Sequence, residues 1–322
     1  MGVLGKATLN LQTIDLGRLE SSDFDERQSL LQAFENQGFV YLDLSSNPQL
    51  VQDWENVLRF MADYFAKDMD EKMIDSRSSD NYGYEPMATS SGVENGKPDY
   101  YESLKASRDS LQWDHSKMVP IVADNQQLFK RFSLTADDAL QTILRQLDIA
   151  LSRSPAQSFQ SWHSRDAACL STLSMFRYPK QDSNDAGVGH GKHTDLGTLT
   201  FLLTTTPGLQ VLTNMGWQYV APKKNCAIIN VGDTLRFLSG YKLRSAVHRV
   251  MPVDKYQRED RYSIAYFLRA ADNTKLTDNS GRSVSAKAWH NEKFDVFRES
   301  HEEQAKRGIL TGGMERGEAL VY

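Results

Sequence analysis

Eight short apolar or alternating runs follow one another between residues 171 and 268, and they constrain the fold more than any other feature of the chain. Turn residues such as Pro207-Gly208 and Ser239-Gly240 separate them. Regularly spaced short strands are typical of a sandwich or a barrel, and eight is the strand count of a double-sheet jelly roll. The runs lie at 171–178, 198–204, 209–212, 217–220, 226–231, 234–238, 246–252 and 262–268.

The chain outside this region has helical patterns. A helix that Ser22 or Asp25 caps is expected to end near Gly38, with a short buried strand at 39–42 after it. Apolar residues at helical spacing predict further helices near 54–65, 140–151 and 286–306. We therefore predict a mainly β protein with flanking helices around a double-stranded β-helix, or jelly-roll, core.

Three regions are expected along the chain. They are an N-terminal helical and strand region at 1–120, a helix plus the jelly-roll core at 121–272, and a C-terminal helix and tail at 273–322. Within the first region, 76–112 is rich in Ser, Gly, Asn, Asp and Tyr. We expect it to be a polar loop that covers the mouth of the core.

Composition excludes several classes of protein. The 322 residues carry a formal net charge of −5 with no basic block, which argues against a nucleic-acid surface. No stretch is long and apolar enough to predict a membrane span, and the first residues lack the apolar centre of a signal peptide. Cys169 and Cys226 are too few for a disulfide framework or a thiolate zinc site, so we expect small core residues. The expectation is a cytoplasmic protein with no evident obligate protein partner.

His193-Thr194-Asp195 is the first candidate site. Residues i and i+2 of an extended segment point the same way, so the imidazole and the carboxylate can meet at one ion. His248 follows Asp195 by 53 residues, in an apolar run at the far end of the strand region. Two histidines and one carboxylate on one face form the geometry that holds non-haem Fe(II).

Arg261-Tyr262-Ser263 is the second candidate, on the run after His248. Arg261 and Ser263 share a face by the same alternation. A guanidinium offers a bidentate fork to a carboxylate, and a serine adds one hydroxyl donor. An iron site with a carboxylate anchor nearby suits a 2-oxoacid co-substrate.

These motifs occur in an order that resembles the 2-oxoglutarate/Fe(II)-dependent dioxygenases of the isopenicillin N synthase-like type. The sequence is more similar to fungal biosynthetic members than to plant members. The resemblance covers about 10–272. It rests on Phe176-Arg177-Tyr178-Pro179, His193-Thr194-Asp195-Leu196-Gly197-Thr198-Leu199-Thr200, Pro207-Gly208-Leu209-Gln210-Val211, Asn230-Val231-Gly232-Asp233-Thr234-Leu235, Ser245-Ala246-Val247-His248-Arg249-Val250 and Arg261-Tyr262-Ser263.

The resemblance implies roles for these residues. His193, Asp195 and His248 would be the catalytic iron ligands. Arg261 and Ser263 would hold the distal carboxylate of 2-oxoglutarate, joined by the Tyr178 hydroxyl. The family commonly has Asn two residues before that tyrosine, where this chain has Phe176, so one hydrogen bond to the co-substrate is missing or replaced.

Substrate contacts are expected from two places. Phe267 and Arg269 follow Ser263 at +4 and +6, so they should face the same cavity. A basic Arg269 predicts an acidic or phenolate-like group on the substrate. Tyr84 and Tyr101, in the polar loop, are the other expected contacts.

The resemblance implies an enzyme, a dioxygenase that uses Fe(II), 2-oxoglutarate and O₂ and releases succinate and CO₂. C–H abstraction on a small natural-product substrate would give hydroxylation, desaturation or oxidative rearrangement. Two alternatives stay open. One is an iron-dependent oxidase of the same fold that uses no 2-oxoglutarate, as isopenicillin N synthase does. The other is a non-catalytic jelly-roll protein with a structural metal, against which the lack of a fourth Cys or His argues.

Other polar residues are expected to have plain structural roles. His163 and Asp166 are interpreted as surface residues, and His190 as a loop residue near the mouth of the site. The segment 230–233 is interpreted as a tight turn whose Asp and Gly satisfy backbone groups.

Overall fold

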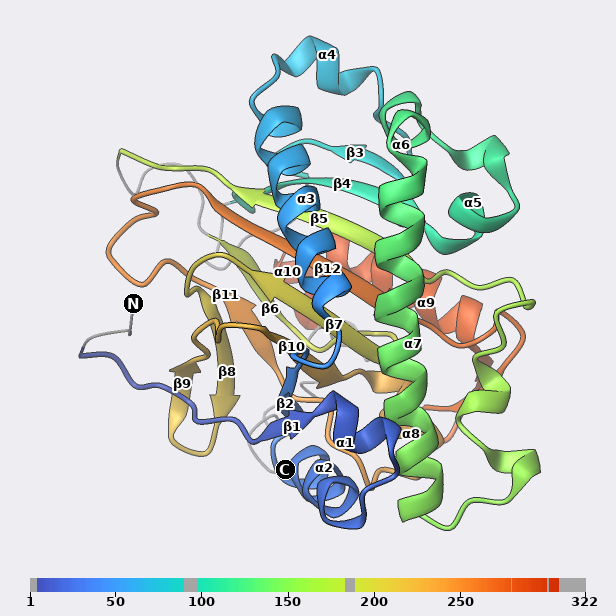
Figure 1. The fold of residues 1–322 in the computed structure, drawn as a ribbon. Helices are drawn as coiled ribbons and strands as arrows, with labels where there is room; N and C mark the ends of the chain where they lie inside the picture. Colours follow the sequence, from blue (N-terminus) through green and yellow to red (C-terminus); the bar gives the residue numbers. More distant parts are fainter. Residues whose placement is uncertain (1–4, 90–97, 183–188, 279, 300, 307–322) are drawn as a thin grey trace.

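The computed structural model describes residues 5–89, 98–182, 189–278, 280–299 and 301–306. Two sheets form its centre (Figure 1). The larger sheet has eight strands in the order β1-β2-β10-β7-β12-β5-β4-β3, and the smaller has four in the order β6-β11-β8-β9. The strands of these sheets are β1 (Thr13–Asp15), β2 (Phe39–Asp43), β3 (Gly83–Glu85), β4 (Glu102–Ser107), β5 (Thr172–Tyr178), β6 (His190–His193), β7 (Leu199–Thr204), β8 (Leu209–Thr213), β9 (Gly216–Tyr219), β10 (Cys226–Val231), β11 (His248–Val250) and β12 (Arg261–Leu268).

Strands β5 to β12 make the predicted jelly roll, with four strands in each layer. β10, β7, β12 and β5 lie side by side in the larger sheet, and β6, β11, β8 and β9 form the smaller one. The N-terminal strands extend the larger sheet at both edges, with β1 and β2 at one and β3 and β4 at the other. A mainly β protein with flanking helices is confirmed.

One predicted strand is wrong. Residues 234–238 belong to a helix, α8 (Asp233–Leu238), which follows directly after β10. A five-residue apolar run does not distinguish a buried strand from one buried helical turn and a half. The eighth strand of the jelly roll is instead β6, whose His-Gly-Lys-His sequence has no apolar pattern to reveal it.

The described parts of the segment 76–112, residues 76–89 and 98–112, contain more regular structure than expected. It contains β3, β4 and the short helix α5 (Arg108–Gln112), and all six residues of β4 are buried. Lys72 is buried beside Glu102, and Lys105 beside Glu85, at Nζ–Oε2 distances of 2.7 and 2.6 Å. Because each charge on β4 is neutralised by a partner, Lys72 of helix α4 (Met69–Met73) or Glu85 of β3, a polar sequence forms a buried strand.

Helices cover the outer face of the larger sheet. The long α7 (Gln126–Ala150) and α3 (Pro48–Phe65) lie beside each other across it, in green and blue in Figure 1. Their apolar faces join the sheet in one core cluster that includes Met61, Phe132 and Phe201. The remaining α-helices are α1 (Leu16–Glu20), α2 (Phe24–Asn36), α4 (Met69–Met73), α6 (Pro120–Asp124), α9 (Ala286–Arg298) and α10 (His301–Lys306).

The expected cap of the first long helix is corrected. Asp23, and not Ser22 or Asp25, accepts the hydrogen bond from the backbone N–H of Glu26 at the start of α2. Gly38 follows this helix with φ of +72°, as a helix stop requires.

The last elements are the small hairpin of β13 (Lys275–Thr277) and β14 (Ser283–Ser285), followed by α9 and α10. The predicted tail at 307–322 lies outside the described residues. Within the described part of the chain, no helix is both long and apolar enough to cross a membrane.

Candidate metal and co-substrate site

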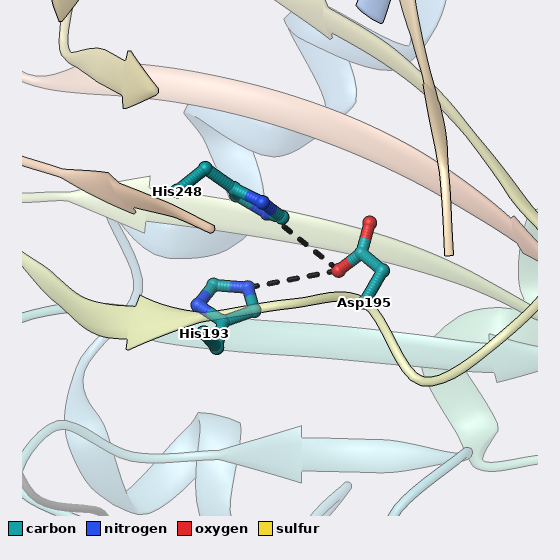
Figure 2. A group of neighbouring side chains, drawn as sticks. All are labelled: His193, Asp195 and His248. Atoms are coloured by element: carbon teal, nitrogen blue, oxygen red, sulfur yellow. Dashed lines mark ion pairs between the residues drawn. The ribbon is translucent and has the colours of Figure 1, made fainter. Parts of the chain in front are cut away.

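His193, Asp195 and His248 meet at the end of the smaller sheet (Figure 2). His193 ends β6 and His248 begins β11, and the two are direct cross-strand partners. The Oδ1 atom of Asp195 lies 3.6 Å from Nε2 of His193 and 3.7 Å from Nε2 of His248. Two ligand atoms each about 2.1 Å from one ion lie roughly 3–4 Å apart, so these three atoms fit a shared metal.

The second polar atom of each side chain is hydrogen-bonded elsewhere, which turns the three converging atoms toward one another. Nδ1 of His193 lies 2.8 Å from the carbonyl of Gly191, and Nδ1 of His248 lies 3.0 Å from that of Ala246. A carbonyl accepts only from a protonated nitrogen, so each Nε2 keeps a lone pair. Oδ2 of Asp195 accepts hydrogen bonds from Thr200 and from Asn230, which leaves Oδ1 for the ion.

The protonation states suit metal ligation. Burial alone would raise the pKa of the Asp195 carboxyl, but the His248 and His193 imidazoles and the Thr200 hydroxyl hold it well below its usual range. Burial and the neighbouring His193 lower the pKa of His248 to about 4. At neutral pH the site therefore presents a carboxylate and a neutral imidazole, the forms that bind metal.

The loop between the ligands is anchored from two other elements. Nζ of Lys293, on α9, donates to the Thr194 hydroxyl at 2.7 Å and to the Thr194 carbonyl at 3.1 Å, and it also pairs with the Asp233 carboxylate. The backbone N–H of Asp233 donates to the carbonyl of Asp195 at 2.7 Å. Trp289 of α9 donates from its indole N–H to the carbonyl of Leu196.

The segment 230–233 is therefore more than the tight turn predicted. Asn230 supports the Asp195 carboxylate and Asp233 supports the backbone of the ligand loop. At Gly232 an added Cβ would lie 2.3 Å from the carbonyl oxygen of Gly197, so only glycine fits there. The sequence shows this motif, but only the fold shows that it contacts Asp195.

Arg261, Ser263 and Tyr178 gather on the larger sheet. Arg261 pairs with Tyr178, and Ser263 with Phe176, in the β12–β5 register. The guanidinium lies 4.8 Å from the Tyr178 ring centroid, and its Nη1 donates to the Ser263 hydroxyl at 3.1 Å. Its Nη2 is buried without a hydrogen-bond partner among the described residues. An orphaned buried donor beside a serine fits a bound carboxylate.

Gly208 lies against this guanidinium on the side of its Nε atom. An added Cβ there would lie 2.8 Å from Nε of Arg261, and Nε itself donates to the Thr206 carbonyl at 3.2 Å. Burial raises the pKa of Tyr178 to about 12, so its phenol keeps the proton and can donate. Phe176, directly opposite Ser263, has no polar side-chain atom, so it offers no hydrogen bond to a bound carboxylate.

A cavity opens beside the candidate ligands His193 and Asp195. It encloses about 700 Å³ of atom-free space, part of it open to solvent. Phe267, Arg269 and Tyr101 line it, as does Phe176. Other lining residues were not predicted from the sequence: Asp80, Glu85, Lys105, Ser174 and Phe294.

Two expectations about this region are corrected. Tyr84 does not face the cavity, because its side chain packs against Tyr64 and its hydroxyl donates to Glu102 at 2.6 Å. His163 is not a surface residue but is 2% exposed, with hydrogen bonds to Phe159 and Thr198. Asp166 is exposed, as predicted.

His190 lies in β6, where a loop was expected, and forms part of the cavity wall. Its ring stacks between Tyr101 and His193, with centroid distances of 4.8 and 4.5 Å. Burial lowers the pKa of His190 well below its usual value, so the ring is neutral. The stack fixes one face of the His193 imidazole.

Comparison with known proteins gives consistent matches along the chain. The 2OG-Fe(II) oxygenase superfamily model matches residues 169–270, and a model described as the N-terminal region of non-haem dioxygenases in morphine synthesis matches residues 11–127. The 2-oxoglutarate-dependent dioxygenase frbH of Dothideomycetidae sp. is 58% identical over 308 residues, which are 95% of this chain and 96% of that protein. Oxidoreductase vrtI of Penicillium aethiopicum is 59% identical, over 96% of this chain and 76% of its own length.

A solved structure shares the fold. A full-length protein of Neurospora crassa, crystallised in complex with alpha-KG, superposes with a TM-score of 0.74 at 22% identity, over 90% of this chain and 99% of that one. Neither the oxidase without 2-oxoglutarate nor the non-catalytic metal-binding protein fits the relatives found by sequence. The chain belongs to the 2OG-Fe(II) oxygenase superfamily, and it is a 2-oxoglutarate-dependent dioxygenase whose cofactors are Fe(II), 2-oxoglutarate and O₂.

Proposed function

We propose that this dioxygenase oxidises a small natural product, with His193, Asp195 and His248 as the iron ligands and with Arg261, Ser263 and Tyr178 as the anchor of the 2-oxoglutarate distal carboxylate. The single observation that carries the proposal is the convergence of Asp195 Oδ1 with two imidazole Nε2 atoms at 3.6 and 3.7 Å. In each of these side chains the other polar atom is hydrogen-bonded elsewhere, so the three converging atoms face one another.

The bound iron and 2-oxoglutarate supply the oxidation, in which O₂ is consumed, succinate and CO₂ are released, and a C–H bond of the substrate is broken. The protein supplies position. Asn230 and Thr200 orient Asp195. Nη2 of Arg261, which is buried without a hydrogen-bond partner among the described residues, can donate to a carboxylate oxygen of 2-oxoglutarate. Aromatic side chains of Tyr101, Phe176 and Phe267 form apolar walls that exclude water from the reacting carbon.

The substrate proposal rests on the cavity. Its four aromatic side chains suit a small, partly aromatic molecule, and Arg269 gives it a buried positive charge. Burial lowers the pKa of Arg269 to about 10, so the side chain stays charged at neutral pH. An acidic or phenolate group on the substrate matches this charge. Hydroxylation, desaturation and oxidative rearrangement all begin with the same C–H cleavage.

The test is 2-oxoglutarate turnover by the purified protein with Fe(II), with succinate and O₂ measured together. We expect succinate to form, and Arg261→Leu to raise the KM for 2-oxoglutarate at least tenfold, a loss of about 1.4 kcal/mol, because a charge-assisted pair is lost. Oxygen uptake without succinate, or an Arg261→Leu protein with an unchanged KM, would contradict the proposed anchor. Asp195→Ala is expected to abolish turnover and the binding of Mn(II) together.

We also propose that the protein works in the cytoplasm, without nucleic acid, membrane or an obligate protein partner. Both cysteines are buried free thiols, and the net charge of −5 disfavours binding to phosphates. A fluorescent fusion of the full chain, localised in the host cell, tests the compartment.

A further inference from the structure

A buried ion pair lies on the wall of the same cavity as His193 and Asp195. Lys105 of β4 and Glu85 of β3 both line the cavity, with Nζ and Oε2 2.6 Å apart. Their side chains are only 7% and 15% exposed. Neither residue belongs to the candidate metal ligands or to the proposed anchor of 2-oxoglutarate.

Both members of the pair have unused hydrogen-bonding capacity. The ammonium of Lys105 has three protons, and among the described residues its hydrogen-bond acceptor is Glu85. Its nitrogen also lies 5.7 Å from the ring centroid of Phe294 on α9. Oε2 of Glu85 accepts from Lys105 and from the Ser103 hydroxyl, and Oε1 accepts from no described residue. The pair can therefore accept and donate further bonds at the same place.

An apolar substrate would be a poor occupant of this wall. Covering an ion pair with apolar atoms removes water from both charges and returns no hydrogen bond. Ser174 lies directly opposite Lys105 in the β4–β5 register and adds another polar group. A ligand that fits must offer polar atoms of its own.

The charges of the wall also balance. Among the described residues, and apart from Asp195, the charged side chains that line the cavity are two cations, Lys105 and Arg269, and two carboxylates, Asp80 and Glu85. A dianion or a pure cation would leave part of this set unmatched, whereas a ligand with one charge of each sign matches it. An α-amino acid carries its ammonium and carboxylate on one carbon, so it can place both against a pair whose charged atoms lie 2.6 Å apart.

We propose that the Lys105–Glu85 pair is a recognition site for a zwitterionic substrate of the α-amino-acid class. The substrate carboxylate binds the free N–H groups of Lys105, on the side of Arg269, and the substrate ammonium donates to Glu85. The side chain of the amino acid then lies among Tyr101, Phe176 and Phe267, with the carbon to be oxidised toward His193. This inference rests on the proposed function, because it assigns the substrate of the same cavity.

The test measures binding by calorimetry to the full-length protein loaded with Mn(II) and 2-oxoglutarate. The probes are the twenty common L-amino acids and, for the amino acid that binds most tightly, its analogues without the amine and without the carboxylate. We expect at least one amino acid to bind and both analogues to bind at least tenfold more weakly. Equal binding of either analogue, or no binding by any amino acid, would overturn the inference.

Variants tie the binding to the pair. Lys105→Met combined with Glu85→Gln removes both charges and leaves no unpaired ion to unfold the protein. We expect it to bind 2-oxoglutarate as before and to lose at least tenfold in amino-acid affinity. The control is Lys72→Met with Glu102→Gln, a buried pair with side chains 6% and 1% exposed and Nζ–Oε2 of 2.7 Å that does not line the cavity. Glu102 also pairs with Arg177, which keeps Asp260 as a partner in this variant.

The two proposals fail in different ways. If 2-oxoglutarate neither binds nor yields succinate, the proposed function fails. If 2-oxoglutarate binds and turns over while the double variant keeps full amino-acid affinity, or the control loses as much as the cavity variant, only the recognition site is wrong.

Discussion

The two carboxylate oxygens of Asp195 have different partners, and this difference prepares the residue for a metal. Oδ2 is held by Thr200 and Asn230, and Oδ1 faces two imidazole nitrogens. A carboxylate with one oxygen fixed cannot rotate freely, so the ligand loses little entropy on binding an ion. The same principle applies to each histidine, whose Nδ1 is fixed by a backbone carbonyl.

Gly208 provides a residue-scale test of the co-substrate anchor that leaves its charge intact. Gly208→Ala places a Cβ 2.8 Å from Nε of Arg261, so the guanidinium must shift. We expect the KM for 2-oxoglutarate to rise about three- to tenfold, with much less change in the affinity for Mn(II). Gly216→Ala is the control, because nothing lies within 4 Å of its added Cβ. Equal KM values for the two variants would contradict the proposed role of Arg261 in binding 2-oxoglutarate.

His163 predicts how stability depends on pH. Burial, with a smaller contribution from the Arg108 charge, lowers its pKa to about 4, from 6.5 in the unfolded chain, and outweighs the opposing effect of the hydrogen bond to the Phe159 carbonyl. Below 6.5 the unfolded chain takes up a proton that the folded protein does not accept until about pH 4. Stability from this residue is therefore full above pH 6.5 and falls by about 3 kcal/mol as the pH drops to about 4.

The measurement is the free energy of unfolding in urea at about pH 7.5 and about pH 5, for the wild type and for His163→Gln. Glutamine can donate and accept at the same place without titrating. We expect the wild type to lose more stability than the variant between the two pH values. The same loss in both proteins would show that other groups cause the pH dependence.

At the scale of elements, helix α9 lies outside the jelly roll but contacts the loop that carries Asp195. Lys293 and Trp289 hold the backbone of the ligand loop, and Phe294 of the same helix lines the cavity. Lys293 is fully buried, and its partner Asp233 is 1% exposed. One helix therefore connects the cavity wall to the residue between two candidate iron ligands.

Replacing Lys293 tests this connection. Lys293→Met with Asp233→Asn removes both charges of the pair and the anchor of Thr194, so we expect Mn(II) affinity to fall about tenfold. Titration calorimetry gives the affinity, and urea unfolding gives the stability. Lys72→Met with Glu102→Gln is the control, since it removes another buried pair elsewhere, with side chains 6% and 1% exposed. It is expected to lose stability and keep its metal affinity. A similar loss of affinity in both variants would mean that α9 acts through general stability.

At the scale of the whole molecule, the proposed ligands bridge the two sheets. The three candidate metal ligands lie on β6, β11 and the loop after β6, while Arg261 and Ser263 lie on β12 of the larger sheet. A 2-oxoglutarate molecule bound at both places contacts both layers of the jelly roll. Only the folded chain brings these residues together, so ligand binding must stabilise the fold.

We therefore expect Mn(II) and 2-oxoglutarate together to raise the melting temperature more than either alone. At a hundredfold excess over Kd, one bound ligand adds about 2.7 kcal/mol to the free energy of unfolding. Differential scanning calorimetry measures the shift, and a chelator should reverse it. Asp195→Ala should show no shift with Mn(II), and a full shift in that variant would contradict the proposed ligand set.

The sequence by itself determined the strand-rich core, the family, and the local pairs His193 with Asp195 and Arg261 with Ser263. The two pairs depend on neighbouring residues alone, because the alternation of an extended strand places the side chains of residues i and i+2 on one face. The same alternation correctly brought Phe267 and Arg269 to one cavity.

The tertiary structure alone decided the surroundings of those pairs. Lys293 is nearly a hundred residues from Thr194, and charged residues such as Lys105 and Glu85 look like surface positions until their partners are known. Tyr84 faces away from the cavity because the β3–β4 register fixes which side of the sheet each residue occupies. These features depend on contacts between distant segments, and the local pattern of a sequence does not contain them.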